Sequence, residues 1–258
     1  MNGDRRPSRP VPAAIDLWLD GDPEGAERSQ RVVATERECL TNQLRCLGAE
    51  PLPSAADFVS ARLPDPTWLC DALAGLGIAV MGAADGVRIT LPGDARKWGR
   101  LHAALQAALA PQALLLDLDG VLADIDGRRP LATIDQVQAL AGRWPLAVIT
   151  SCPRRLAEAV LARHGFAPFV KVLVAAEDGP GKPDPAPVRL ALRQLRVASA
   201  WMVGDNPSDV TAARGAGVVP LAIAPRGIGA ESHAERLRAA GAARLVDGLG
   251  ALAREGRP

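Results

Sequence analysis

The strongest chemical signal in this sequence is a pair of aspartates at the end of an apolar run. In the segment ALLLDLDGVLADIDG, residues 113–127, four apolar residues lead to Asp117 and Asp119, and Gly120 follows. A carboxylate resists burial unless it is paired or bound to a cation, so a buried strand gains no stability from ending this way. The pair therefore predicts a function at this strand end.

Similar polar residues stand at corresponding places further along the chain. Apolar runs near 113–118, 145–150, 170–175, 199–204 and 218–224 alternate with helical patterns. Such runs are typical of parallel strands covered on both faces, which predicts a doubly wound, Rossmann-like α/β domain. Ligands bind beyond the carboxyl ends of the strands in these sheets. The other polar residues placed at this edge are Thr150, Ser151, Lys182, Asp205, Asn206 and Asp209.

These residue types suit phosphoryl chemistry. Packed carboxylates repel each other unless a cation neutralises them, and oxygen ligands suit Mg²⁺. Asp117 can act as a nucleophile on phosphorus, and Asp119 can protonate the leaving group and then activate water. Thr150 can donate to a phosphoryl oxygen, and Lys182 can neutralise the charge on both the nucleophile and the phosphate.

Each residue also has a structural explanation. An aspartate at a strand end often caps a turn or helix, Asp209 could start the helix after Pro207, and Lys182 alone would be a surface lysine. An inactive copy would be expected to lack one member of the set, and none is lacking. We therefore favour the chemical interpretation.

Residues 113–228 resemble the haloacid dehalogenase superfamily of hydrolases. The family's four motifs occur in order as LLLDLDGVL, LAVITS, GKPDP and MVGDNPSDVTAARGAG. The resemblance implies Asp117 as nucleophile and Asp119 as acid/base, with Thr150 and Lys182 binding phosphate. Because the family's dehalogenases lack the second aspartate, it also implies phosphate transfer to water.

The same resemblance implies a Mg²⁺ site. Asp205 is its main ligand, and Asp117 and the backbone carbonyl of Asp119 complete the protein's share. Asp209 holds a metal-bound water or orients Lys182. We add Ser151 to the phosphate-binding set, and Asn206 as a substrate contact.

The motif spacing leaves no room for a large cap domain. About 30 residues separate Asp119 from Thr150, and they must supply a flap, VLADIDGRRPLA, and a helix. A similar number leads on to Lys182. We expect an open site, with Asp124 and Asp126 as turn residues of the flap, and a phosphorylated small molecule or macromolecule as substrate.

The first 110 residues follow another pattern. Residues 1–22 are expected to be irregular, and 23–110 to form a small α+β domain that precedes the catalytic domain, 111–258. Its predicted elements are helices at 23–47, 64–77 and 94–109 and strands at 55–62, 78–82 and 87–92. Cys39 and Cys46 are expected to be small core residues of the first helix.

This domain resembles the C-terminal small domain of fold-type-I pyridoxal-phosphate aminotransferases, particularly the histidinol-phosphate branch. The resemblance rests on LRCLGAEPLPSAADFVSARL, WLCDALAGLGIAVMG and GVRITLP. It implies that Arg88 contacts the acidic end of a substrate, although Asp57 and Met81 depart from the family's usual Asn and Arg. No pyridoxal phosphate is expected, because the large domain is absent and no lysine lies in a loop suited to a Schiff base.

Composition sets the remaining expectations. The net charge is +1, and no apolar run approaches 20 residues, so we expect neither nucleic acid nor membrane as a partner. The 4 cysteines form no metal-binding pattern and indicate free thiols in a cytoplasmic protein. The N-terminal domain could stabilise or dimerise the protein, cover the site, or dock a partner.

The sequence thus predicts a Mg²⁺-dependent phosphatase that acts through an aspartyl-phosphate. A binding or regulatory module, with the aminotransferase-like domain as its interaction surface, is the alternative. Phosphotransfer to an acceptor other than water is a third hypothesis, which the missing cap disfavours.

Overall fold

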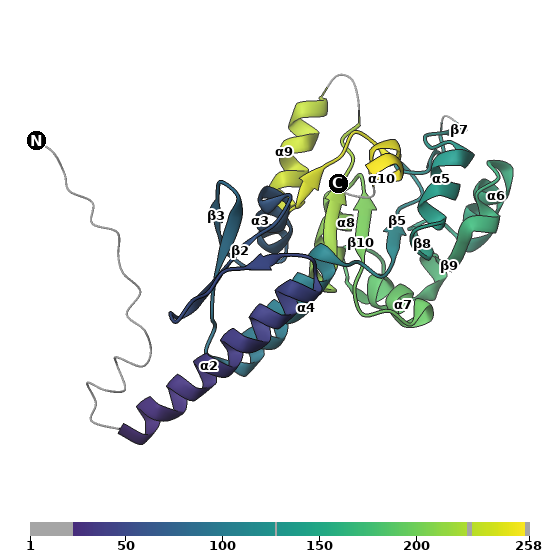
Figure 1. Ribbon diagram of the computed structural model, residues 1–258. Helices are drawn as coiled ribbons and strands as arrows, with labels where there is room; N and C mark the ends of the chain where they lie inside the picture. The colour runs from purple at the N-terminus through teal and green to yellow at the C-terminus, as the bar shows by residue number, and fades with distance from the viewer. Residues whose placement is uncertain (1–22, 127, 226–228, 256–258) are drawn as a thin grey trace, which may run out of the picture.

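A six-stranded parallel sheet forms the centre of the catalytic domain (Figure 1). The computed structural model describes residues 23–126, 128–225 and 229–255. The strand order is β12-β11-β10-β5-β8-β9, with all neighbours parallel. The five predicted strands are present as β5 (Leu114–Leu116), β8 (Leu146–Ile149), β9 (Val170–Val174), β10 (Trp201–Gly204) and β11 (Val219–Ala222). The predicted doubly wound fold is confirmed, and β12 (Arg244–Leu245) adds a sixth strand.

Helices cover both faces of this sheet because its strands are apolar on both sides. Leu114 and Leu116 face a core shared with α5 (Ile134–Ala141), α6 (Arg154–Arg163) and α10 (Leu249–Glu255). Leu115 faces a second core, shared with α7 (Ala186–Leu195) and α8 (Pro207–Gly215). Helix α9 (Ala230–Ala240) packs against α8 beside β11. None of the described helices is long and apolar enough to cross a membrane.

The connections between strands are short, as the motif spacing predicted. Between β5 and β8 the chain forms only a flap hairpin, β6 (Ala123–Asp124) with β7 (Arg129–Pro130), followed by α5. Thr133 and Gln136 start α5 with the predicted capping box. Between β8 and α7 lie only α6, β9 and two short 3₁₀ turns, Ala167–Phe169 and Ala176–Asp178. The described part of the catalytic domain therefore has no cap.

Residues 23–109 form a small α+β layer. Its antiparallel sheet has the order β1-β2-β4-β3, and its helices pack on one face of that sheet. Helices α2 and α4 lie side by side (Figure 1). The elements are α2 (Pro23–Cys46), β1 (Glu50–Pro51), β2 (Phe58–Arg62), α3 (Pro66–Gly75), β3 (Met81–Ala83), β4 (Gly86–Thr90) and α4 (Ala95–Leu109). The predicted helices are present, the strands expected at 55–62 and 78–82 are the shorter or shifted β2 and β3, and β1 is additional. Residues 1–22 lie outside the described residues.

The expected burial of two cysteines is wrong. Cys39 and Cys46 are both exposed on α2. The buried face of this helix carries Leu40 and Leu44, together with Gln43. Cys39 precedes Leu40 by one residue and Cys46 follows Leu44 by two, so the helical rotation carries both thiols away from the core.

The α+β layer and the parallel sheet share one continuous core. Helix α3 packs on β3 and β4 of its own sheet and on β11 and β12 of the other, so it lies between the two sheets. Trp68 of α3 meets Trp201 of β10 edge to face, with 5.3 Å between ring centroids. Both indole N–H groups donate to the end of α4: Trp68 to the Ala108 carbonyl at 3.0 Å and Trp201 to the Ala107 carbonyl at 2.8 Å.

This contact lies at the amino ends of the parallel strands. Trp201 is the first residue of β10 and pairs in register with Leu114, the first residue of β5. Arg214, at the end of α8, donates to the Gly75 carbonyl at the end of α3. Arg244, in β12, pairs with Asp65 at the start of α3. The α+β layer is thus attached at the amino ends of β5 and β10 and, through α3, along β11 and β12.

Replacing Trp68 by alanine should destabilise the whole protein. The change removes a buried ring at the junction of both layers, and such truncations cost about 3–5 kcal/mol in unfolding free energy. Met81→Ala, at a side chain that is 63% exposed, should change it by less than about 0.5 kcal/mol. Urea unfolding of both variants is the measurement, and similar values for the two would contradict the shared core.

Candidate active site

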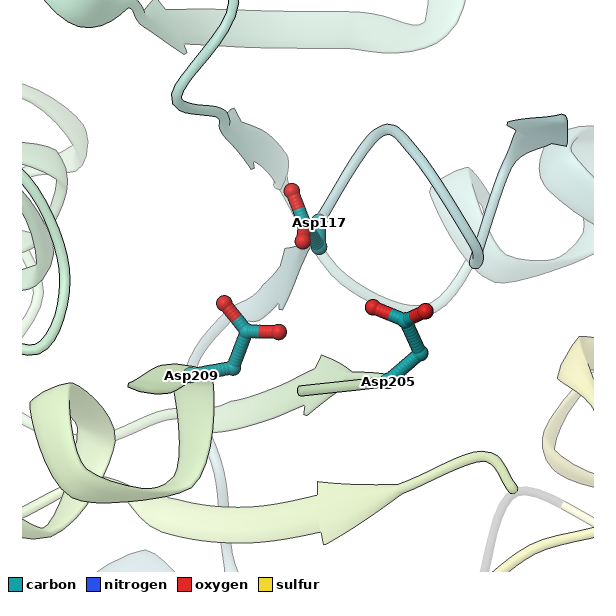
Figure 2. A group of neighbouring side chains, drawn as sticks. All are labelled: Asp117, Asp205 and Asp209. Carbon is teal, nitrogen blue, oxygen red and sulfur yellow. The ribbon is translucent and has the colours of Figure 1, made fainter. Parts of the chain in front are cut away.

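Three aspartates, two from the ends of neighbouring strands and one from a helix, converge at the carboxyl edge of the parallel sheet. Asp117 follows β5, Asp205 follows β10, and Asp209 lies in the first turn of α8 (Figure 2). One carboxylate oxygen from each lies within 4.8 Å of those of the other two. Asp117 and Asp209 are buried, and Asp205 is half-buried. The convergence predicted from the strand ends is therefore present.

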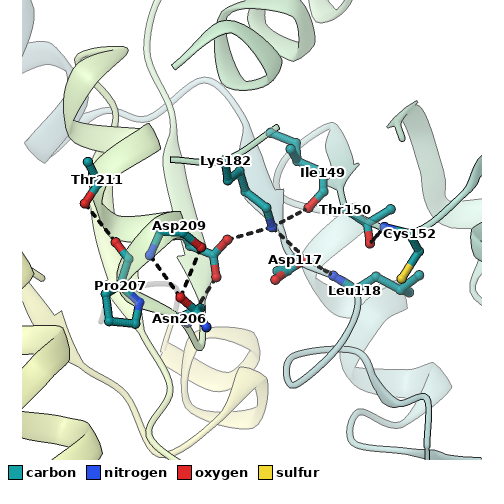
Figure 3. A network of polar contacts seen from close by, with 11 residues as sticks. Asp117, Leu118, Ile149, Thr150, Cys152, Lys182, Asn206, Pro207, Asp209 and Thr211 are labelled. Atoms are coloured by element: carbon teal, nitrogen blue, oxygen red, sulfur yellow. Dashed lines mark hydrogen bonds and ion pairs between the residues drawn. The ribbon is translucent and has the colours of Figure 1, made fainter. Parts of the chain in front are cut away.

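A buried lysine joins two of these carboxylates. Lys182 Nζ lies 2.9 Å from Asp117 Oδ1 and 2.6 Å from Asp209 Oδ1, and it donates to the Ile149 carbonyl at 3.1 Å (Figure 3). Its side chain is only 4% exposed. The interpretation of Lys182 as a surface lysine is thus excluded. Asp209 forms an ion pair with this lysine, and it also serves the structural role considered for it, because its Oδ2 accepts the Asn206 N–H in a capping box.

Two glycines allow the carboxylates to approach. Gly120 has φ +75° and lies against the Asp205 carboxylate, so a β-carbon there would overlap the carboxylate. Gly204 likewise lies against the Asp209 side chain with no space for a β-carbon. Gly120 and Gly204 are therefore required by the closeness of the carboxylates.

The remaining predicted residues line the same edge in different ways. Asp119 is exposed, and its Oδ1 accepts the Ile125 N–H of the flap at 3.0 Å. Thr150 is buried, and its hydroxyl oxygen accepts the Cys152 N–H at 3.1 Å. Ser151 is exposed beside it. Asn206 caps α8, because its Oδ1 accepts the Ser208 N–H.

Arg88 is not brought to this edge. It lies on β4 in the antiparallel sheet, with its guanidinium carbon 3.6 Å from the centre of the Phe58 ring. Its neighbours Val87 and Ile89 are buried toward the helices, so Arg88 points to the opposite face, away from α3 and the catalytic sheet. The predicted substrate contact of Arg88 is therefore not formed within this chain.

A cavity of about 350 Å³ lies elsewhere, at the junction of the two layers. Its lining includes Trp68, Trp144 and Trp201, and none of the residues of the carboxylate cluster. The carboxylates are thus approached from the open edge of the sheet and not through this cavity.

The charges of the cluster change its titration. Burial and the Asp209 charge raise the pKa of Asp117 to about 7, although Lys182 opposes the shift. Burial and the charges of Asp209 and Asp119 raise the pKa of Asp205 to about 6. Burial alone would lower the pKa of Lys182, but the two carboxylates beside it outweigh burial and raise it. One ammonium therefore does not neutralise the cluster.

This charge imbalance fits a divalent cation. Asp117 and Asp205 offer oxygen ligands, which hard cations such as Mg²⁺ prefer. Asp209 is the least available of the three, because Lys182 and the Asn206 N–H engage its two oxygens. A cation beside Asp117 and Asp205 would favour their ionised forms and lower both raised pKa values.

One residue beside the cluster lies outside all the sequence motifs. His233, on α9, has its Nε2 2.6 Å from the Asp205 carbonyl oxygen. Only its spatial position marks it, because no spacing rule connects α9 to the strand that carries Asp205.

Comparisons with known proteins agree with this geometry. Residues 100–217 match the family model "haloacid dehalogenase-like hydrolase". The phosphoglycolate phosphatase of Cupriavidus necator is 41% identical over 112 residues, 42% of this chain and 47% of that protein. Validoxylamine A 7'-phosphate phosphatase of Streptomyces hygroscopicus subsp. limoneus is 36% identical over 117 residues, 44% of this chain and 53% of that protein. Residues 100–217 are therefore similar to haloacid dehalogenase-like hydrolases, and the chain spans about half the length of these relatives.

A solved haloacid dehalogenase-like hydrolase from Streptococcus pneumoniae is similar with a TM-score of 0.47 and 15% identity. That match covers 57% of this chain and 99% of the other. The family model begins at residue 100, so it does not bear on the aminotransferase resemblance of the N-terminal layer, which stays a prediction.

The metal-free protein should lose stability as the pH rises. The folded state holds protons on Asp117 and Asp205 more tightly than the unfolded chain, where their pKa is near 3.8. Stability should therefore fall between about pH 4 and pH 7 as both groups ionise, and Mg²⁺ should reduce the fall. Melting temperatures measured across this range, with EDTA or with Mg²⁺, check this.

Asp117→Asn serves as the control, because it should flatten the metal-free profile. A melting temperature that rises from pH 5 to pH 8 in EDTA would contradict the raised pKa values.

Proposed function

We propose that this chain is a Mg²⁺-dependent phosphatase that hydrolyses a phosphomonoester through an aspartyl-phosphate on Asp117. The observation that carries the proposal is the buried ammonium of Lys182 between Asp117 and Asp209, with Asp205 within reach of both carboxylates. The phosphatase names of the relatives support the same reaction class.

Asp117 is prepared to attack phosphorus with one oxygen. Its Oδ1 accepts from the Leu118 N–H at 2.7 Å and from Lys182, and these are its side-chain contacts among the described residues. Its Oδ2 is therefore the oxygen that bonds to phosphorus. Lys182 neutralises charge on the nucleophile and then on the transferred group. The Thr150 hydroxyl, which accepts from Cys152, keeps its proton to donate to a phosphoryl oxygen.

Asp119 moves the protons. It protonates the leaving oxygen as the bond from phosphorus to that oxygen breaks. It then takes a proton from the water that attacks the aspartyl-phosphate, which releases inorganic phosphate and restores Asp117. Its exposed position lets it reach both the leaving group and water, and the Ile125 N–H of the flap orients it.

Asp117 and Asp205 would hold the Mg²⁺, together with the backbone carbonyl of Asp119. When bound, the ion supplies positive charge against the phosphoryl oxygens. Asp209 would contribute less to the ion, because its Oδ1 pairs with Lys182 and its Oδ2 accepts the Asn206 N–H.

The substrate is a phosphorylated molecule whose leaving group extends beyond an open edge. The short flap supports a site open to small molecules and macromolecules alike. The α+β layer then serves to stabilise or dimerise the protein, not to cover its own site. We propose a cytoplasmic location, with neither nucleic acid nor membrane as a partner.

Asp117→Asn should abolish Mg²⁺-dependent hydrolysis of p-nitrophenyl phosphate. The amide cannot form the acyl phosphate, so kcat should fall at least about 1,000-fold. Asp126→Asn, at an exposed flap residue, should keep wild-type activity and is the matched control. Release of p-nitrophenol is the measurement. Activity that is absent in the wild type, or that survives in Asp117→Asn, would favour the binding or regulatory alternative.

Asp119→Ala should separate the two proton transfers. p-Nitrophenolate leaves without protonation, so the variant should still phosphorylate itself but should hydrolyse the aspartyl-phosphate slowly. Stopped-flow mixing should give a burst of about one p-nitrophenol per enzyme, while an alkyl phosphomonoester should lose about 100-fold or more in its first step. Equal losses for both substrates with no burst would contradict the role of Asp119.

A further inference from the structure

Helix α9 contacts the backbone of the proposed metal ligand Asp205. The contact is His233, a half-buried residue in the first half of α9, whose Nε2 lies 2.6 Å from the Asp205 carbonyl oxygen. On the other side of the ring, an Arg236 guanidinium nitrogen lies 2.9 Å from Nδ1. Arg236, His233 and Asp205 thus form a continuous chain of polar contacts.

The chemistry of the three groups determines which atom donates and which accepts in each of these hydrogen bonds. A guanidinium can only donate hydrogen bonds, so Nδ1 of His233 must be the acceptor. The ring proton then lies on Nε2, which donates to the Asp205 carbonyl. Arg236 therefore selects the tautomer in which His233 binds the backbone of Asp205.

The helix that carries His233 is anchored in the protein interior. Leu237 of α9 is buried against Val210 of α8 and Ala222 of β11, and Ala234 of the same helix is buried as well. His233 directly precedes Ala234, so the position of its backbone relative to the end of β10 is fixed. Motion of the ring relative to the sheet is restricted for this reason.

The Asp205 carboxylate depends on this support. It packs against the α-carbon of Gly120, where even a methyl group would overlap it. A small rotation of the Asp205 backbone would change where its oxygens point relative to Asp117. The His233 bond to the Asp205 carbonyl opposes such a rotation.

We propose that His233 is a positioning residue for the metal site, and that Arg236 holds its ring. Together they align the Asp205 carboxylate for a divalent cation. The proposal rests on the Mg²⁺ site of the proposed function. Residues that orient a metal ligand in this way typically contribute about 10–100-fold to metal affinity.

The test measures Mg²⁺ binding directly, by isothermal titration calorimetry on the full-length protein without substrate. His233→Ala should raise the Kd for Mg²⁺ about 10-fold or more, and His233→Gln should recover much of the loss, because its amide can donate to the same carbonyl. At saturating Mg²⁺ the KM for p-nitrophenyl phosphate should stay unchanged, because the contacts of His233 are with Asp205 and Arg236 and not with the phosphate-binding Thr150 or Lys182.

Arg238→Ala is the matched control. Arg238 lies on the exposed side of the same helix and pairs with Glu231, so its loss should leave the Kd unchanged. Should His233→Ala fail to fold, Arg236→Ala replaces an exposed side chain and should raise the Kd several-fold.

The outcomes separate the two proposals. If the wild-type protein binds Mg²⁺, and the His233→Ala and Arg236→Ala variants bind it with the same Kd, the role of His233 is overturned. An equal loss in Arg238→Ala would overturn it as well. A wild-type protein that binds no Mg²⁺ and hydrolyses no p-nitrophenyl phosphate would overturn the proposed function and this inference with it.

Discussion

The arrangement at the catalytic edge depends on one buried ammonium. Lys182 holds Asp117 and Asp209 within 3 Å of its charge, although the three side chains are almost completely withdrawn from water. Removing one partner from such a buried group leaves an uncompensated charge, which is strongly unfavourable. Three segments therefore depend on one another for their positions: the loop that carries Lys182, the turn after β5 and the start of α8. One ammonium cannot balance the three aspartates of this edge, and the remaining negative charge is what makes the edge suited to a cation.

The opposite edge of the sheet is held by a different kind of interaction. Two indole N–H groups, from Trp68 and Trp201, satisfy carbonyls in the last turn of α4, where helices have acceptors without intrahelical partners. The same rings fill the space between α3 and the sheet. The α+β layer thus shares its core with one face of the parallel sheet.

Much of the catalytic edge was predictable because its signals are local. Strand positions follow from apolar runs, and Asp117, Thr150, Lys182 and Asp205 lie in short motifs of fixed order. Other features depend on packing across the fold and leave no local trace. Strand β12 has two residues and no apolar run, and His233 reaches Asp205 from a helix that starts 25 positions later in the chain. Arg88 belongs to a convincing pattern, but the alternation along β4 directs it away from the catalytic sheet.

The short flap has a kinetic consequence. In a hydrolase with a large cap, closing and opening can limit turnover and can discriminate between substrates. Here the connection from β5 to β8 contains only a two-stranded hairpin and one helix, so no domain has to move before product leaves. Under the proposed function, the chemistry on Asp117 would then set turnover, and the body of the substrate would remain in water. Discrimination between substrates has to come from the few groups at the rim of the sheet or from a second molecule that covers it.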